Sequence, residues 1–144
     1  YFAMNAPVGG LLEKAYFISK GFEDSCIITK EEAEAAGMEG VQTIETVALD
    51  DVLKDKRVTF IKFDVEGSEK EAIEGCSRQI SNGANVICAL YHRNEDMFEL
   101  PLLVKRINPR YKLYIRHQLY IPAWETNLYA ICDDPNGMTA GTEG

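Results

Sequence analysis

Acids and histidines in this sequence follow stretches that are typical of buried strands. Asp64 and Glu66 come directly after the apolar run at 58–63, and His92 closely follows the apolar run at 86–90. The carboxyl ends of parallel strands meet at one edge of a sheet, where α/β proteins place their active sites. Carboxylates and imidazoles gathered there can transfer protons or bind a divalent metal ion. We therefore expect these side chains to form a site.

Two further residues are expected at the same edge. His117 follows a third strand at 111–115, and Glu125 precedes a fourth strand at 126–131. The short connection between the last two strands predicts that they pair antiparallel, so the fourth begins where the third ends. His92 and His117 are the only histidines in the chain. Both are thus predicted at one edge of the sheet.

The acids near residue 64 also have a purely structural interpretation. Ser68 and Glu69 suit the N-terminus of a helix, as a cap and as a solvated charge, and we interpret them so. Asp64 differs, because an unpaired charge is costly in a strand that should be largely buried. We interpret Asp64 as functional, whereas Glu66 fits either interpretation equally well.

The order of elements predicts an α/β fold. Apolar strands at 58–63, 86–90 and 111–115 alternate with one helix that ends at Asn82 and another whose apolar face includes Leu100, with Pro101 in its first turn. The first two strands are apolar nearly throughout, as expected of strands covered on both faces. Before them we predict short strands at 15–18, 26–28 and 41–47, a helix at 31–36 and a turning segment at 49–53.

Composition narrows the class of protein. The chain has 144 residues, of which 46% are hydrophobic, enough for one core, and it has no apolar run long enough to span a bilayer. A net charge of −8 argues against nucleic acid and membrane as partners, because both attract basic surfaces. Its four cysteines lack C-x-x-C spacing, which favours packed thiols and a reduced, cytoplasmic setting.

Three segments resemble the FkbM family of S-adenosylmethionine-dependent methyltransferases: residues 47–51, 61–69 and 125–130. The second contains every fixed position of the family pattern I-K-x-D-x-E-G-x-E. The resemblance implies a Rossmann-like class I methyltransferase sheet, incomplete at its N-terminus, with the fourth to seventh strands present and the seventh as an antiparallel edge. It assigns residues 1–132 to part of a catalytic domain of a longer protein and leaves 133–144 as a polar, frayed tail.

The resemblance also implies a function, which is methyl transfer from S-adenosylmethionine to a hydroxyl of a sugar or another small metabolite. A base must take the hydroxyl proton, and we favour His117 or Asp64 over His92, with Asp64 and Glu66 as orienting groups. The implied site residues are Asp64, Glu66, His92 and His117 for catalysis, Asn5 and Asp64 for the cofactor, and Tyr91, Trp124 and Glu125 for the acceptor.

Two features of nucleotide-binding α/β folds have no counterpart in this sequence. These are the glycine-rich loop after the first strand and the acidic residue that ends the second strand. We therefore expect catalysis from a longer parent chain rather than from these residues alone, and self-association through open sheet edges. Two alternatives stay open. One is a divalent-metal-dependent α/β enzyme that uses Asp64, Glu66 and His92, and the other is a non-catalytic remnant or interaction module.

Overall fold

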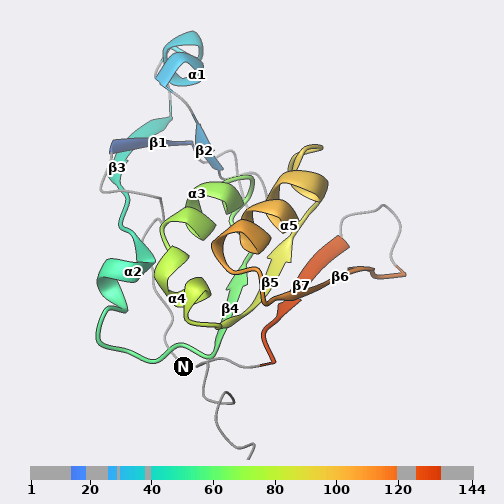
Figure 1. The fold of residues 1–144 in the computed structure, drawn as a ribbon. Coiled ribbons are helices and arrows are strands. Elements are labelled where there is room, and N and C mark those ends of the chain that lie inside the picture. Colours follow the sequence, from blue (N-terminus) through green and yellow to red (C-terminus); the bar gives the residue numbers. More distant parts are fainter. Residues whose placement is uncertain (1–13, 19–25, 29, 38–39, 120–125, 134–144) are drawn as a thin grey trace, which may run out of the picture.

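The chain is described by a computed structural model over residues 14–18, 26–28, 30–37, 40–119 and 126–133. Its strands form two sheets, which are separate in the chain and in space (Figure 1). The larger sheet contains β4 (Phe60–Phe63), β5 (Asn85–Ala89), β6 (Lys112–His117) and β7 (Thr126–Ile131). The sequence patterns placed these four strands within about two residues of their observed bounds.

The larger sheet has the order β4-β5-β7-β6. β4 and β5 are parallel, and β7 runs antiparallel to both β5 and β6. Consequently β4, β5 and β6 all have their carboxyl ends on the same side of the sheet, which we call the carboxyl-end rim. The mixed sheet and the antiparallel pairing of the last two strands are confirmed.

The predicted place of the seventh strand at the edge of the sheet is wrong. β7 lies between β5 and β6, and β6 is the edge strand. Burial explains the difference, because Thr126, Leu128 and Ala130 of β7 are all buried and both of its edges are paired. Most residues of β6 are exposed, as suits a strand with one free edge.

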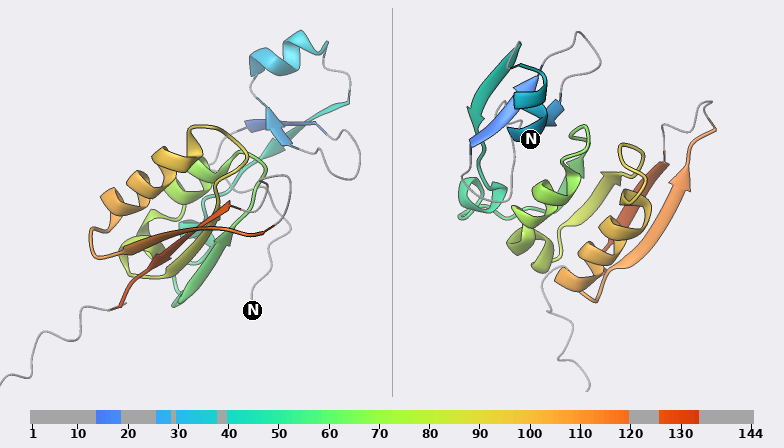
Figure 2. Two further views of the ribbon diagram at one scale, coloured as in Figure 1. Left: turned by 90° about the vertical axis from the view of Figure 1, so that its right-hand side faces the viewer. Right: turned by 90° about the horizontal axis from the view of Figure 1, so that it is seen from above.

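Three helices cover one face of this sheet: α3 (Glu69–Glu74), α4 (Ser77–Ser81) and α5 (Asp96–Ile107) (Figures 1 and 2). Their apolar side chains pack against those of the strands to form the core, whose largest members include Phe63, Ile73, Ile80, Leu100, Leu128 and Tyr111. On the opposite face Phe60 is 55% exposed. The expectation that β4 is covered on both faces is therefore wrong for the described residues, since all three helices lie on the same side.

The single helix expected up to Asn82 is instead two short helices. α3 ends at Glu74, and the carbonyl of the capping residue Gly75 accepts a hydrogen bond from the backbone N–H of Asp50. The Asp50 carboxylate then accepts the backbone N–H groups of Arg78 (2.7 Å) and Gln79 (3.2 Å) at the start of α4. Asp50 belongs to α2 (Leu49–Val52), a helical turn where a turning segment was expected. The break between α3 and α4 is thus bonded by Asp50, a residue that is distant in sequence.

Replacing Asp50 with alanine is expected to lower the free energy of unfolding by about 0.5–2 kcal/mol, because two N–H groups of α4 lose their acceptor. Urea unfolding followed by circular dichroism measures the change. Asp51→Ala is the matched control, since Asp51 is an exposed acid in the same helix. Equal losses in the two variants would contradict the capping role.

α5 begins earlier than its apolar face predicts. Its first turn is closed by reciprocal bonds in which the Asp96 carboxylate accepts the N–H of Arg93 (3.0 Å) and the Asp96 N–H bonds the Arg93 carbonyl (3.2 Å). Pro101 is therefore the sixth residue of α5 rather than a first-turn residue. Proline has no N–H to bond the carbonyl four residues earlier, so α5 lacks one helical hydrogen bond there.

The smaller sheet contains β1 (Lys14–Ile18), β2 (Cys26–Ile28) and β3 (Val41–Glu45), in the order β2-β1-β3 with all pairs antiparallel. α1 (Lys30–Ala35) connects β2 to β3. The strand expected at 41–47 is present as β3, in which Gln42, Thr43 and Glu45 are exposed and Val41 and Ile44 are partly buried. Among the residues that the structure describes, no helix has the length and apolar character needed to cross a membrane.

Candidate functional site

The turn after β4 has an unusual backbone. The N–H of Ser68 bonds the carbonyl of Val65 (3.3 Å), and the two residues between them have positive φ angles, +54° at Glu66 and +92° at Gly67. Positive φ at both central positions is what a type I′ turn requires. Glycine adopts it without strain, but for glutamate it is uncommon and needs support from its surroundings.

That support comes from Glu69, the first residue of α3, which is 0% exposed. Its Oε1 accepts the N–H of Val65 (2.9 Å), and its Oε2 accepts the N–H of Gly67 (3.0 Å). The interpretation of Glu69 as solvated helix-end charge is therefore wrong. The family pattern at 61–69 could have indicated a role for Glu69, because it fixes a glutamate at this position and a capping preference does not require one.

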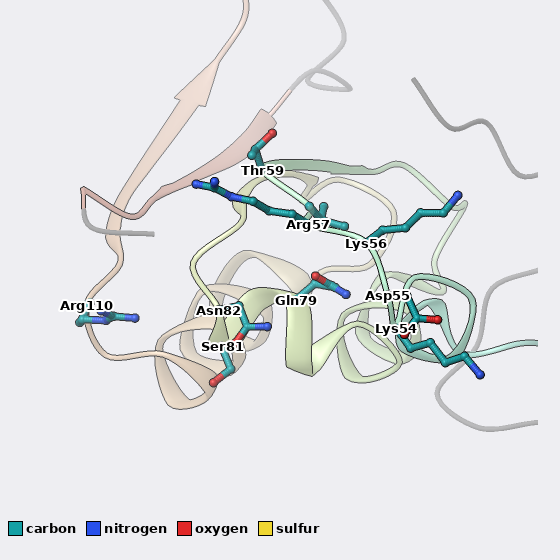
Figure 3. Close-up of a pocket in the computed structure, with 10 residues that line it drawn as sticks. Lys54, Asp55, Lys56, Arg57, Thr59, Gln79, Ser81, Asn82 and Arg110 are labelled. Carbon is teal, nitrogen blue, oxygen red and sulfur yellow. The ribbon is translucent and has the colours of Figure 1, made fainter. Parts of the chain in front are cut away.

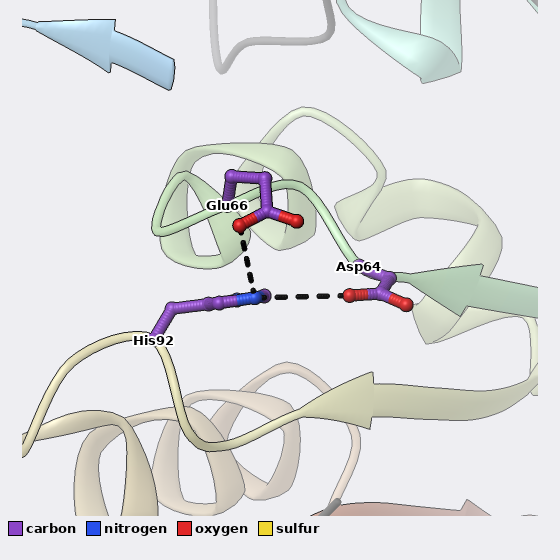
Figure 4. A group of neighbouring side chains, drawn as sticks. All are labelled: Asp64, Glu66 and His92. Atoms are coloured by element: carbon purple, nitrogen blue, oxygen red, sulfur yellow. Dashed lines mark ion pairs between the residues drawn. The ribbon is translucent and has the colours of Figure 1, made fainter. Parts of the chain in front are cut away.

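Glu69 also contacts His92, which lies just after β5. Glu69 Oε1 is 2.7 Å from His92 Nδ1, and the imidazole is only 11% exposed. An ionised carboxylate can only accept, so Nδ1 carries a proton and donates it to this bond. The other ring nitrogen, Nε2, faces Glu66 Oε2 at 3.5 Å and Asp64 Oδ1 at 3.8 Å (Figure 4). We call these four residues the acid–histidine cluster.

The cluster shifts the pKa values of its buried pair in opposite directions. The hydrogen bond to Glu69 raises the pKa of His92; burial opposes this, and the charges of Glu69, Glu66 and Asp64 add to it. Burial alone would raise the pKa of Glu69, but the bonds from His92 and Val65 and the charge of His92 outweigh burial and lower it. Each partner therefore favours the charged form of the other.

These shifts predict how stability depends on pH. The folded pKa of His92 lies above its unfolded value near 6.5, so its contribution is present below that pH and lost as pH rises through the folded pKa. The folded pKa of Glu69 lies below its unfolded value near 4.5, so its contribution is present above that pH and lost on acidification. The pair stabilises the fold most between about pH 4.5 and 6.5.

Urea unfolding of the wild-type chain and of His92→Gln across this range tests the prediction. The wild type should lose stability above pH 6.5, and the variant should lose less over the same interval. Because all other titrating groups are shared, the difference between the two curves isolates His92. Parallel curves above pH 6.5 would contradict the pairing.

Asp64 is exposed and not buried as its neighbouring sequence predicted. β4 ends at Phe63, so Asp64 lies in the loop beyond the last paired residue. Its charge is paired, because Oδ2 is 2.6 Å from Lys62 Nζ and Oδ1 accepts the hydroxyl of Tyr91 (3.2 Å). The Tyr91 ring also packs against the ring of His92, with centroids 4.4 Å apart. Asp64 and Tyr91 thus both adjoin the imidazole.

His117 is at the carboxyl-end rim but lies apart from the cluster. It is the last residue of β6, and its Nδ1 lies 2.9 Å from the Thr126 hydroxyl. β7 separates β6 from β5, and two strand spacings amount to about 10 Å. The expected meeting of both histidines in one site therefore does not occur. Three other expected site residues, Asn5, Trp124 and Glu125, lie outside the described residues.

The cluster has the donor types of a divalent-metal site. Asp64, Glu66 and His92 each offer one ligand atom, and these atoms lie within 4.8 Å of one another. Carboxylate and imidazole suit Mg²⁺, Mn²⁺ or Fe²⁺, and a metal-binding histidine commonly donates its other N–H to a carboxylate, as His92 does to Glu69. Lys62 already neutralises Asp64, however. The cluster can hold a cation or accept a proton.

A separate cleft of about 580 Å³ lies at the opposite end of β4 (Figure 3). It is lined by Lys54, Asp55, Lys56, Arg57, Val58, Thr59, Gln79, Ser81, Asn82 and Arg110. No member of the acid–histidine cluster lines it. We place the candidate site at the cluster because the residues that line the cleft are mainly cations, amides and hydroxyls with a single carboxylate, whereas the cluster brings three carboxylates to an imidazole.

Comparison with known proteins identifies the family of this chain. The profile of a family described as "Methyltransferase FkbM domain" matches residues 15–121, about three quarters of the chain. The chain belongs to the FkbM methyltransferase family. The matched range includes the whole acid–histidine cluster, and the Rossmann-like fold implied by the sequence is confirmed. A search of curated protein sequences gave no match.

Among solved structures, the chain is similar to methyltransferase FkbM from Methylobacillus flagellatus KT, with a TM-score of 0.64 and 26% sequence identity. The alignment covers 88% of this chain and 27% of that chain. This FkbM-family chain thus spans about a quarter of the length of the protein it resembles.

The buried cysteines of this FkbM-family chain behave as apolar packing groups. Cys76, Cys88 and Cys132 are buried, and none of the three is in a disulfide bond. Burial raises the pKa of the Cys76 thiol to about 12 and that of Cys88 further still, so both remain thiols near neutral pH. This agrees with their interpretation as small core side chains.

Proposed function

We propose that this chain is the part of an FkbM methyltransferase that holds the proton acceptor for methylation of a hydroxyl group, with S-adenosylmethionine as methyl donor. Membership of the family supports the reaction class. The single observation that carries the proposal is the arrangement of His92, with Nδ1 bound to buried Glu69 and Nε2 directed at the carboxyl-end rim.

A neutral hydroxyl is a poor nucleophile, so methyl transfer to it needs a base. When bound, S-adenosylmethionine supplies an electrophilic methyl group on a sulfonium. His92 Nε2 would take the proton of the acceptor hydroxyl as the hydroxyl oxygen bonds the methyl carbon and the carbon–sulfur bond breaks, which leaves the thioether S-adenosylhomocysteine. The negative charges of Asp64 and Glu66 beside Nε2 would favour the imidazolium that forms.

The geometry favours a different base from those that the sequence favoured. Both oxygens of the Asp64 carboxylate already accept hydrogen bonds, Oδ2 from Lys62 and Oδ1 from Tyr91. His117 adjoins Thr126 rather than the acids of the cluster. His92 has a lone pair on the rim side and a buried carboxylate behind it, as a positioned general base requires. We therefore propose His92 as the base.

The reaction is tested with the whole methyltransferase domain that contains these residues. Donor labelled in its methyl group is incubated with sugars and other small metabolites that carry hydroxyls, and with the same compounds lacking the hydroxyl. Label in an ether methyl supports the proposal. Label on nitrogen or carbon, or none with any acceptor while the donor binds, would contradict it.

A divalent cation is a second possibility for the same side chains, supported by the convergence of their ligand atoms. Such an ion would lower the pKa of a hydroxyl bound to it. Calorimetric titration with Mg²⁺ and with Mn²⁺ tests it, with Glu66→Gln as the variant that removes one ligand. Absence of binding heat at millimolar metal would eliminate the metal-site hypothesis and leave the His92 imidazole as the base.

A further inference from the structure

Glu69 is fully buried, and its carboxylate accepts hydrogen bonds from Val65, Gly67 and His92 at the candidate site. We infer that Glu69 is the positioning residue of that site, fixing the ring of His92 with Nδ1 protonated and Nε2 open toward the acceptor. This inference rests on the proposed function for its catalytic meaning, although the geometry that it describes can be measured without catalysis.

Three donors fix the carboxylate. Oε1 takes the N–H of Val65 and the Nδ1–H of His92, and Oε2 takes the N–H of Gly67. The two backbone donors cannot move without disrupting the turn, so they fix the position of the Glu69 carboxylate. The third hydrogen bond therefore fixes the orientation of the His92 ring. A flipped or tautomerised imidazole would leave a buried, charged oxygen short of a donor, which is costly. The His92 ring therefore has one favoured orientation.

The Glu69 carboxylate also holds Glu66 in position. Val65 and Gly67 are the neighbours of Glu66, whose φ of +54° is strained for glutamate. By bonding both neighbours, Glu69 holds Glu66 with its carboxylate 3.5 Å from His92 Nε2. Gly67 is itself close to a neighbour, since a Cβ there would lie 3.3 Å from Arg93 Nε. One buried acid thus sets the relative position of the imidazole and the Glu66 carboxylate.

A purely structural role for Glu69 makes a different prediction. If Glu69 served only the turn, its replacement would change stability but not the protonation of His92. The charged groups that face His92 are Glu69, Glu66 and Asp64, and the Tyr91 ring packs beside it. Removing the charge of Glu69 alone should therefore change the pKa and the tautomer of His92, which a purely structural role would leave unchanged.

Nitrogen-15 NMR of the 144-residue chain distinguishes these roles. The chain has two histidines, so a His117→Gln background leaves His92 as the single imidazole signal. We expect the Nδ1–H tautomer in this background. Glu69→Gln, which keeps the shape but cannot accept at both ends, should lower the pKa of His92 toward its ordinary value and populate the Nε2–H tautomer. Glu71→Gln, an exposed acid of the same helix, should leave both unchanged.

The inference is overturned if the background chain shows the Nε2–H tautomer, a result that needs no folded Glu69 variant. It is also overturned if a folded Glu69→Gln chain keeps the pKa and tautomer of its background. Neither measurement involves donor or acceptor, so failure to methylate any hydroxyl would defeat the proposed function and leave this result intact. In the whole methyltransferase, Glu69→Gln should also move the acidic limb of the kcat/KM pH profile to lower pH, and Glu71→Gln should not.

Discussion

Replacing His92 with glutamine is expected to lower kcat/KM for methyl transfer by about 100- to 10,000-fold, the usual contribution of a general base. The change is to be made in the whole methyltransferase domain that contains these residues. Glutamine has no nitrogen that can take a proton near neutral pH, so the acceptor hydroxyl stays protonated. Initial rates at saturating donor measure the effect, and rates at alkaline pH should partly recover as the hydroxyl ionises without help.

His117→Gln is the matched control, because it makes the same replacement at the other histidine of the carboxyl-end rim. His117 adjoins Thr126 and lies about two strand spacings from β5, so its loss should change kcat/KM far less. Donor binding and urea unfolding of both variants exclude loss of fold as the cause. A larger loss of activity in His117→Gln than in His92→Gln would transfer the role of base to His117.

Replacing Leu100 with alanine is expected to lower the free energy of unfolding by about 2–5 kcal/mol. Leu100 is 0% exposed in α5 and belongs to the core between the helices and the larger sheet. Its truncation removes buried methyl groups and leaves a cavity that neighbouring side chains fill only in part. Such a loss is a large fraction of the stability of a small domain.

Leu102→Ala is the control for this change, because Leu102 lies in the same helix and is 62% exposed. Its replacement should cost less than about 0.5 kcal/mol, as is usual at surface positions. Urea unfolding of the three chains gives the comparison. Similar losses at the two positions would mean that α5 does not pack on the sheet through the face that the structure places there.

The strands of the larger sheet were predictable because their signals are local. Apolar runs near β4 and β5 and the short connection before β7 depend only on neighbouring residues, and the structure confirms the strands and the antiparallel pairing that they indicate. The carboxyl-end rim follows from these directions. That is why Asp64 and His92, which follow the adjacent parallel strands β4 and β5, were expected at one place and are found there.

Other features depend on contacts between residues far apart in sequence. The break between α3 and α4 uses the backbone of Asp50, about 25 residues before Gly75, and no local pattern contains that partner. The place of β7 depends on its pairing with β5, which a connection length cannot reveal. The burial of Glu69 depends on His92 in the same way. Capping preferences describe a helix end in isolation, so they assigned this acid to solvent.

The central claim is that these residues are part of an S-adenosylmethionine-dependent methyltransferase. Its most direct test is calorimetric titration of S-adenosylhomocysteine into two proteins, the 144-residue chain and a polypeptide extended to the whole methyltransferase domain. We predict saturable binding to the extended polypeptide and none to the 144-residue chain, which lacks the glycine-rich loop. Absence of binding to a folded extended polypeptide would contradict the account and leave the family relationship as common ancestry of the fold.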